Sequence, residues 1–205
     1  MKLTWYGHSC FKAEFMGGSV VFDPYAPGKV PGLELPQMEA DMVICSHKHG
    51  NHYSPDSVHI SGRSHQLAVE QIETFHDGCG GTLRGMNTVS VVSSDGIRLA
   101  HLGDLGHELS PAQLAALGRI DVLLIPVGGY YTIDAAQAKS VIGAVKPKIT
   151  VPMHYRFKDR GLAPLAEIDD FLAAIGQELS IYSADSVIEI ESETPPGIYL
   201  LRWPD

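Results

Sequence analysis

Histidine is concentrated in one short segment of this sequence. Three of the ten histidines lie in the six residues from His47 to His52, which read HKHGNH and directly follow an apolar segment that ends at Ser46. His47 and His49 are two residues apart, so in an extended segment their side chains project to one side, and His52 can return from the following turn. Neutral imidazole binds zinc and also iron, nickel or copper. The segment therefore predicts a metal site on a loop that leaves a strand.

Three further residues of metal-binding types follow other apolar segments. They are His76 after residues 71–75, Asp104 after residues 97–102, and His154 after residues 148–151. Side chains at the ends of strands on one sheet edge converge on a single site. The Asp104 carboxylate offers two oxygens, which suffice to bridge two cations about 3.5–4 Å apart. We therefore expect one site that binds one or two ions.

The elements that must position these residues can also be predicted. Short segments rich in β-branched and aromatic residues occupy the first half, at residues 3–6, 10–15, 19–23, 41–46, 90–93 and 97–102. In the second half, strands at 121–127, 148–151, 179–182, 187–190 and 198–201 are interleaved with helices at 110–117, 134–145 and 164–175. Ser110 and Asp134 are typical helix N-caps. Strands followed by alternating strands and helices indicate mixed sheets covered by helices.

Composition favours one globular domain over residues 1–205. Hydrophobic residues make up 44% of the chain, which is enough for a sizeable core. The net charge is −9, so nucleic-acid binding is not expected, because phosphate contacts require concentrated Lys and Arg. No apolar run reaches the roughly 18 residues of a membrane span, and the first residues do not read as a signal peptide. Three cysteines without CxxC spacing indicate free thiols and a cytoplasmic location.

The segment HKHGNH resembles the HxHxDH signature of the metallo-β-lactamase superfamily. Other segments match the same superfamily in order: VVFDP, FHDG, HLGDLGH, LLIPVGGYYTID and VKPKITVPMHY. The opening segment TWYGHSCF resembles that of its predicted metal-dependent hydrolase branch, which includes proteins similar to ascorbate-6-phosphate lactonase. The resemblance covers about residues 1 to 160. It implies an α+β fold, the αββα sandwich of two mixed β-sheets flanked by helices.

The resemblance also implies roles for individual residues. His47, His49 and His76 would bind one metal ion, His52 and His154 would bind a second ion, and Asp104 would bridge both. Asp23 would hydrogen bond to a ligand histidine. His8 would lie at the rim of the site and contact substrate, and Tyr155 is a further candidate for the substrate pocket.

Asn51 stands where the signature of the superfamily has Asp. That Asp normally binds the second metal and can take a proton from the attacking water. The amide of Asn is neutral, a weaker ligand, and unable to act as a general base. Asp77 or Asp56 could compensate, a single ion could suffice, or the chain could be a weakened hydrolase or a non-enzymatic metal-binding protein.

These residues together predict a metal-dependent hydrolase with a small-molecule substrate. A divalent ion, zinc or alternatively manganese, iron or nickel, lowers the pKa of its water toward 7. The hydroxide attacks an ester, lactone or phosphodiester, with Asp104 positioning the ion and the nucleophile and Asn51 beside them. A phosphodiesterase acting on a small nucleotide is the alternative within the same fold. Lys48 and Arg156 are candidates for contacting an anionic substrate.

Overall fold

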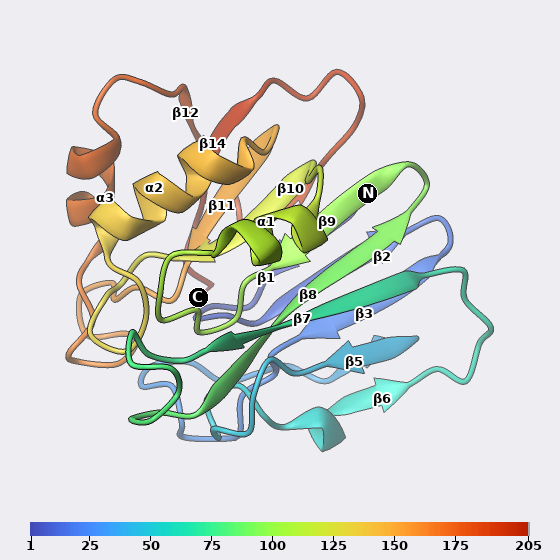
Figure 1. Cartoon of the computed structure of the whole chain (residues 1–205). Coiled ribbons are helices and arrows are strands. Elements are labelled where there is room, and N and C mark those ends of the chain that lie inside the picture. The colour runs from blue at the N-terminus through green and yellow to red at the C-terminus, as the bar shows by residue number, and fades with distance from the viewer. Residues whose placement is uncertain (205) are drawn as a thin grey trace.

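Two β-sheets face each other in the computed structural model, which describes residues 1–204 (Figure 1). The first sheet has the strand order β13-β1-β2-β3-β5, and the second has the order β12-β14-β11-β10-β9-β8-β7. The space between the sheets is filled by one hydrophobic core, to which both sheets contribute. The predicted α+β sandwich of two mixed sheets is therefore confirmed.

The five-stranded sheet is built almost entirely from the N-terminal residues. Its strands are β1 (Lys2–Trp5), β2 (Phe11–Phe15), β3 (Gly18–Phe22), β5 (Met42–Ile44) and β13 (Val187–Glu189). Neighbours are antiparallel except for β3 and β5, which are parallel. Phe11 and Phe15 are buried, whereas Lys12 and Glu14 between them are partly exposed and form an ion pair. One face of this sheet thus packs on the core and the other faces solvent.

The seven-stranded sheet contains β7 (Ala68–Phe75), β8 (Met86–Ser94), β9 (Ile97–His101), β10 (Val122–Pro126), β11 (Ile149–Met153), β12 (Ile181–Ala184) and β14 (Gly197–Leu201). All five residues of both β10 and β11 are buried, as expected for parallel strands covered on both faces. β9, β10 and β11 are parallel, and β7 and β9 are both antiparallel to β8. The carboxyl ends of β7, β9, β10 and β11 therefore lie at the same edge of the sheet.

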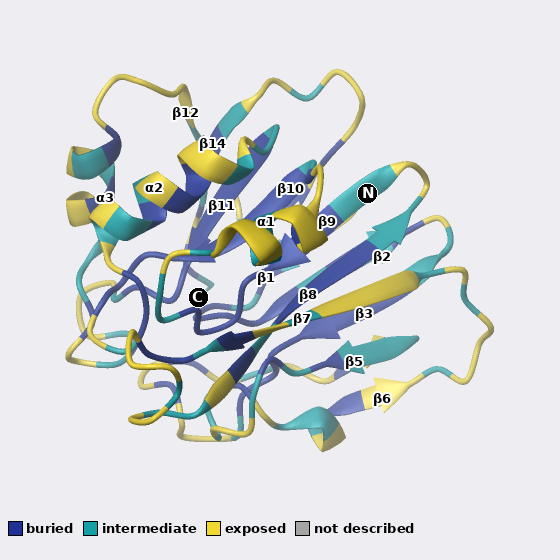
Figure 2. Ribbon diagram, viewed as in Figure 1, coloured by how far each residue is buried: buried dark blue, intermediate teal, exposed yellow. Residues whose placement is uncertain are grey.

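Three α-helices occur among residues 1–204, and all of them lie over the seven-stranded sheet in Figure 1: α1 (Pro111–Leu117), α2 (Ala135–Val145) and α3 (Ile168–Ile175). Ser110 and Asp134 accept hydrogen bonds from the backbone N–H groups of Gln113 and Gln137, which completes the predicted N-caps. Figure 2 shows buried residues along most strands of the two sheets, whereas β7 and the outer sides of the helices are largely exposed. None of the helices in the described part of the chain is long and apolar enough to cross a membrane.

Two local predictions differ from the structure. Helix α3 begins at Ile168 instead of residue 164, because Ala166 donates a backbone hydrogen bond to Gly128 and accepts one from Arg156. These bonds hold residues before Ile168 in an extended path. A small parallel pair of β4 (Met38–Ala40) and β6 (Val58–Ile60), with a 3₁₀ turn at Pro55–Ser57, was not predicted.

Asp41 ties three segments of the N-terminal half together, and its environment predicts a pH-dependent stability. Its carboxylate accepts hydrogen bonds from Ser61 Oγ, from the backbone N–H and Oγ of Ser19, and from Arg63 Nε. The hydrogen bond from Ser61, together with those from Ser19 and Arg63, holds the pKa of Asp41 well below its usual range, because these bonds outweigh the effect of burial, which raises the pKa. A carboxyl whose folded pKa is depressed adds stability above its unfolded pKa of about 3.9, and the contribution is lost as the pH falls toward the folded pKa.

We therefore expect Asp41→Asn to lower the free energy of unfolding at pH 7 by about 2 kcal/mol, a typical value for hydrogen bonds to a charged group. Urea unfolding at pH 7 and at pH 3 measures the effect, which should be smaller at pH 3. An equal loss at both pH values would show that the charge of Asp41 contributes nothing.

Candidate metal centre

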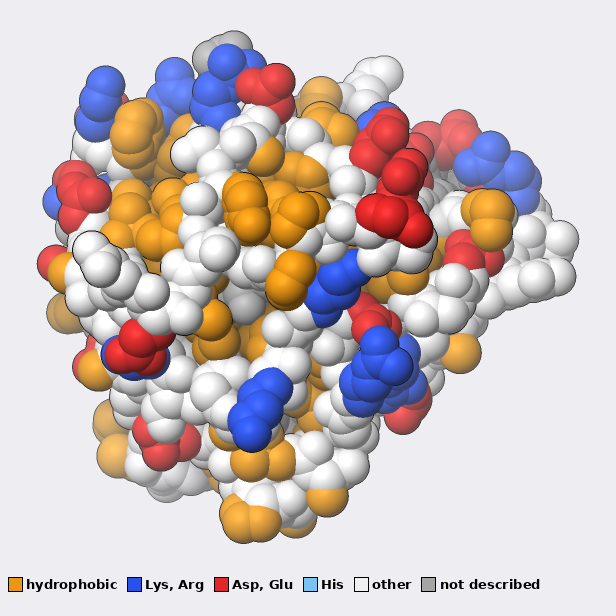
Figure 3. All heavy atoms as spheres, turned by 90° about the horizontal axis from the view of Figure 1, so that it is seen from above, with side chains coloured by type: hydrophobic (Ala, Val, Ile, Leu, Met, Phe, Trp, Pro, Cys, Tyr) orange, Lys and Arg blue, Asp and Glu red, His pale blue; other side chains and the backbone are white. Residues whose placement is uncertain are grey.

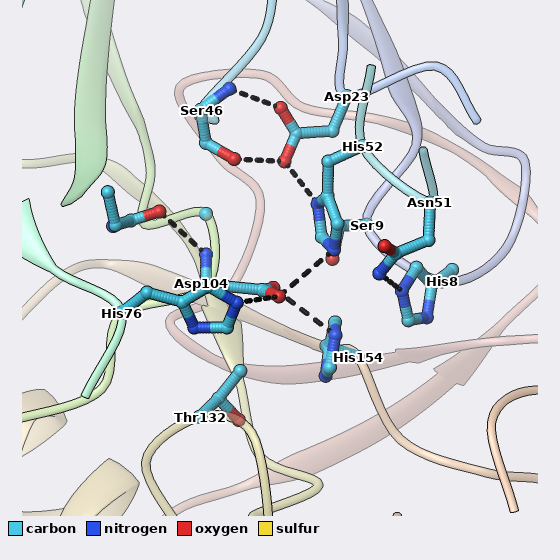
Figure 4. A network of polar contacts seen from close by, with 12 residues as sticks. His8, Ser9, Asp23, Ser46, Asn51, His52, His76, Asp104, Thr132 and His154 are labelled. Carbon is cyan, nitrogen blue, oxygen red and sulfur yellow. Dashed lines mark hydrogen bonds and ion pairs between the residues drawn. The ribbon is translucent and has the colours of Figure 1, made fainter. Parts of the chain in front are cut away.

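The histidines predicted as ligands meet at the sheet edge where the strands end. His47, His49 and His52 lie in the loop after β5, His76 and His154 directly follow β7 and β11, and Asp104 lies three residues after the end of β9. His8 lies in the turn between β1 and β2, which belong to the same sheet as β5. Figure 4 shows His8, His52, His76 and His154 around Asp104. No histidine is visible on the face seen from above in Figure 3, where hydrophobic side chains lie between charged ones.

Asp104 is the centre of this cluster. Its carboxylate oxygens lie 3.1 Å from Nε2 of His52, 3.3 Å from Nε2 of His76, 3.2 Å from Nε2 of His154 and 3.8 Å from Nε2 of His47. These side chains are at most 5% exposed. The structure thus brings four of the five predicted histidine ligands around the Asp104 carboxylate, and the fifth, His49, stacks edge-on against His47 with 4.6 Å between the ring centroids.

The cluster shifts the pKa values of Asp104, His47, His52 and His76. Burial raises the pKa of Asp104, but His154 and His52 outweigh it and hold the value well below its usual range. Burial, together with the neighbouring His52, lowers the pKa of His47 to about 3, and burial also lowers the pKa of His76. His52 behaves differently, because Asp104 and Asp23 outweigh its burial and raise its pKa to about 10. At neutral pH, His47 and His76 are therefore neutral and ready to bind a cation.

The ring nitrogens and the carboxylate of the cluster are better suited to binding a divalent cation than to hydrogen bonding with one another. Within residues 1–204, several buried atoms of the cluster have no hydrogen-bond partner: Nε2 of His47 and His52, Nδ1 of His76, both ring nitrogens of His154, and Oδ1 of Asp104. The contacts of these histidines with Asp104 are close, but the atoms named above do not meet the geometry of a hydrogen bond. Leaving a buried polar atom without a partner costs about 1–3 kcal/mol. Imidazole nitrogens and a carboxylate are zinc ligands, and a bound cation would satisfy these atoms together.

Two sets of donors can each surround a cation. In the first set, one ring nitrogen each of His47, His49 and His76 lies within 4.8 Å of the other two. In the second set, donor atoms of His47, His52 and Asp104 all lie within 4.8 Å of one another, and Nε2 of His154 contacts the other oxygen of Asp104. These two sets contain the residues expected for the two sites, and Asp104 contacts members of both.

Asp23 holds His52 in place from behind the cluster. One carboxylate oxygen accepts a hydrogen bond from His52 Nδ1 at 2.7 Å, and the two oxygens also accept from the backbone N–H and Oγ of Ser46 at 2.7 and 2.6 Å. Because Nδ1 carries the proton in this contact, His52 presents Nε2 to the centre. The Asp23 side chain is therefore hydrogen bonded to His52, which the resemblance implies to be a ligand.

This contact makes a testable prediction about metal affinity. We expect Asp23→Asn to weaken binding of zinc by about 10- to 100-fold, the usual effect of removing a partner that orients a ligand histidine. Competition with a chromophoric chelator measures the dissociation constant. A matched control is Asp121→Asn, which alters a half-buried carboxylate before β10, at the other end of the strand. If both variants bind zinc as tightly as the parent chain, Asp23 does not act through His52.

The backbone at the site is strained. His8, Asp23 and His154 all have positive φ, at 51°, 44° and 54°. Conformations of this kind cost about 1–3 kcal/mol each and persist where the surroundings enforce them, often at functional sites. The strain directs side chains from both sheets toward the same point.

Two glycines of the segment HLGDLGH, Gly103 and Gly106, allow this segment to pack closely against Ser46 and Asp77. Gly103 has φ 57°, and a Cβ atom there would lie 2.5 Å from Cβ of Ser46. A Cβ atom at Gly106 would lie 2.5 Å from Cα of Asp77. Any side chain at either position would push the Asp104 turn away from the His47 or His76 loop.

His8 lies deeper than expected. The resemblance implied a place at the rim, but the residue is fully buried and its ring packs against His154 with 4.1 Å between the ring centroids. Asn51 contacts it, with 3.0 Å between Asn51 Nδ2 and His8 Nε2. Burial, reinforced by His154 and His52, lowers the pKa of His8 well below its usual value.

The structure does not support the roles expected for Asp77 and Tyr155. The Asp77 carboxylate accepts hydrogen bonds from the backbone N–H groups of Cys79, Gly81, Leu83 and Arg84, so it organises its own loop and has no capacity left to replace the missing Asp. Tyr155 is 3% exposed and packs between Trp5 and Trp203, with ring centroids 5.6 and 5.7 Å away. Asp56, the other compensating candidate, is exposed in the 3₁₀ turn.

The mouth of the site contains Arg84 and Leu162, which were not predicted. A cavity of about 290 Å³ is lined by His49, Asn51, His76, Arg84, Asp104, Tyr131 and Leu162. The guanidinium of Arg84 lies over the Tyr131 ring, 5.6 Å from its centroid, and among residues 1–204 it has no carboxylate within 4 Å. Of the basic residues proposed from the sequence, Lys48 is exposed and Arg156 is paired with Glu167 at 2.8 Å.

Comparisons with known proteins agree with this geometry. The family described as the β-lactamase superfamily domain matches residues 2–154, three quarters of the chain. A UPF0173 metal-dependent hydrolase from Archaeoglobus fulgidus is 32% identical, and the alignment covers 85% of this chain and 90% of that relative. The chain therefore belongs to the β-lactamase superfamily, as its motifs predicted.

Solved structures of other proteins have the same fold. A candidate zinc-dependent hydrolase of the metallo-β-lactamase superfamily from Thermotoga maritima superimposes with a TM-score of 0.79 at 35% identity, covering 98% of this chain and 97% of that one. A metallo hydrolase from Ignicoccus hospitalis, 20% identical, has a TM-score of 0.64 over 85% of this chain and 89% of its own, and shows the shared fold.

Proposed function

We propose that this protein is a metal-dependent hydrolase whose cation is zinc. The observation that carries the proposal is the buried ring of histidines around Asp104, with ring nitrogens that have no hydrogen-bond partner. The names of the relatives support it, since members of this family with comparable length are called metal-dependent hydrolases. His47, His49 and His76 would hold one ion, and His52 and His154 would hold a second, with Asp104 between them.

The chain's own residues prepare this site for hydrolysis. When bound, a divalent cation makes water acidic enough to supply hydroxide near neutral pH and stabilises negative charge on the attacked group. Asp104 orients both halves of the cluster through its two oxygens, and Asp23 keeps the Nε2 atom of His52 turned inward. Asn51 cannot take a proton, and the low pKa of Asp104 makes it a weak acceptor. We therefore expect the proton of the attacking water to leave through solvent at the open mouth.

The proposed substrate is a small anionic ester, lactone or phosphodiester. A cavity of about 290 Å³ admits a small molecule. Arg84 is the one Lys or Arg that lines it, and its guanidinium is placed to form charge-assisted hydrogen bonds with a carboxylate or phosphate. The overall charge of −9 disfavours a nucleic-acid substrate.

Substitution of Arg84 tests the charge of the substrate. We expect Arg84→Ala to raise KM for an anionic ester by about 10- to 100-fold, because a hydrogen bond between charged groups contributes about 1.5–3 kcal/mol. A neutral ester with the same leaving group should be hydrolysed equally well by both proteins, and Arg84→Lys should lie between them. Arg119→Ala, which removes an 86% exposed side chain near the start of β10, is the control. An equal loss for charged and neutral esters would refute the assignment.

The proposed function itself is tested by turnover. The zinc-loaded protein is assayed against p-nitrophenyl esters, small lactones and bis(p-nitrophenyl) phosphate, before and after treatment with a chelator. We expect hydrolysis of at least one class, its loss on chelation, and its return when zinc is added. Turnover that persists after complete removal of metal would contradict the proposal, as would a fully loaded protein that hydrolyses none of the three classes.

A further inference from the structure

His8 occupies the position from which a residue can reach the second cation site. It lies in the tight turn between β1 and β2 and is fully buried, with φ 51°. Its carbonyl accepts hydrogen bonds from Trp5 Nε1 at 3.1 Å and from the backbone N–H of His154 at 3.2 Å. These bonds fasten the turn to the end of β11 in the other sheet, and the rings of His8 and His154 pack against each other.

Three histidines form a compact group at this point. His8, His52 and His154 each offer one ring nitrogen that lies within 4.8 Å of the other two, and all three residues are buried. The centroid of the His8 ring lies 4.1 Å from the centroid of the His154 ring and 5.0 Å from that of the His52 ring. Nδ1 of His8 is buried without a hydrogen-bond partner, as is Nε2 of both other rings. Such a group of buried, unpartnered imidazole nitrogens is suited to binding a transition-metal cation.

Asn51 has a different task from the Asp that the superfamily signature would place there. Its amide contacts His8 Nε2 at 3.0 Å. A half-turn of the amide exchanges its oxygen and nitrogen, which places the oxygen where it accepts a hydrogen bond from His8 Nε2–H. The proton then resides on Nε2, and Nδ1 is left with a free lone pair. A ligand histidine commonly donates its second N–H in this way.

We propose that His8 is a ligand of the second cation and takes the place of the missing carboxylate, with Asn51 as the residue that positions its ring. The second site then consists of His8, His52, His154 and an oxygen of Asp104. Imidazole is a stronger zinc ligand than an amide oxygen, so the substitution at Asn51 leaves the site occupied. This inference rests on the metal centre of the proposed function and is independent of the reaction that the centre performs.

Counting metal ions in single and double variants tests the assignment. His8→Asn is the informative change, since Asn tolerates a positive φ and its short side chain cannot reach the cluster. After reconstitution with zinc and removal of free metal, we expect two ions per chain in the parent protein and one in His8→Asn. The double variant His8→Asn with Asn51→Asp should regain the second ion, because the carboxylate ligand is restored.

The control is His107→Asn, since both ring nitrogens of His107 are hydrogen bonded to backbone groups outside the cluster. It should retain two ions. The assignment is overturned if His8→Asn keeps two ions, or if the parent protein and His8→Asn both bind one. Turnover is measured separately. Metal counts that follow the expectation, without any hydrolysis, would support His8 as a ligand and refute the proposed function. Hydrolysis by a His8→Asn protein that keeps two ions would refute His8 as a ligand and support the proposed function.

A measurement on the parent chain covers the case in which His8→Asn does not fold. Zinc is titrated into protein labelled with ¹⁵N at histidine, and the ring nitrogens are followed by NMR. Between one and two equivalents, one ring nitrogen of His8 is expected to move to a metal-bound position while the other stays protonated. Resonances of His8 that do not change through two equivalents would overturn the assignment.

Discussion

Asp104→Asn is expected to lower turnover by on the order of 10³-fold or more and to remove at least one metal ion per chain. The carboxylate lies 3.1–3.3 Å from Nε2 of His52, His76 and His154, so both halves of the cluster depend on its charge. A cation that stabilises a transition state contributes several kcal/mol, and each 1.36 kcal/mol corresponds to a factor of ten in rate. Turnover numbers at saturating zinc, together with elemental analysis of the purified protein, measure both effects.

The matched control for this variant is Asp121→Asn. Asp121 precedes β10, whereas the site follows the carboxyl ends of the strands, and its carboxylate binds Arg98 and Arg119. It should keep both ions and the parent turnover. An Asp104→Asn protein that also retained full metal content and full turnover would show that the cluster is not the reaction centre.

Zinc is expected to stabilise the fold strongly. At about 1,000 times the dissociation constant, a ligand that binds only the folded state adds about 4 kcal/mol to the free energy of unfolding. For a chain of this size, that corresponds to a rise in Tm of roughly 8–16 °C. The physical reason is the set of buried nitrogens and the carboxylate oxygen that have no other partner. Calorimetry of chelator-treated protein with and without added zinc gives the value.

The pH dependence of this stabilisation has a defined sign. His52 carries a proton at neutral pH because Asp104 and Asp23 outweigh its burial and raise its pKa to about 10. A cation must displace that proton, and metal binding that releases protons becomes stronger as the pH rises. The rise in Tm should therefore be larger at pH 8 than at pH 6. A zinc effect of the same size in Asp104→Asn would place the binding site elsewhere.

Most strands and helices could be predicted because their signals are local. Ser110 and Asp134 were predicted as N-caps from residue type alone, and both form complete capping boxes. The pair of β4 and β6 was not predicted, because both strands are short and lie outside the apolar segments from which strands were assigned. The start of α3 was wrong for a related reason, since the path of residue 166 is decided by its bonds to Gly128 and Arg156, which are distant in sequence.

The site shows the same division between local and tertiary information. The metal-binding types at strand ends could be read directly, because parallel strands bring their carboxyl ends together. The side chains of Asp77 and Tyr155 could not be placed, since the first turns into its own glycine-containing loop and the second into an aromatic group formed with Trp5 and Trp203. Arg84 had no signal at all, because only the fold of the loop after His76 brings it to the mouth.

The most direct test of the metal centre is an anomalous-difference map from zinc-reconstituted crystals, recorded at the zinc absorption edge. The account predicts two peaks per chain on either side of Asp104, one surrounded by His47, His49 and His76 and the other by His52 and His154. Crystals of fully reconstituted protein without any peak at this cluster would contradict it.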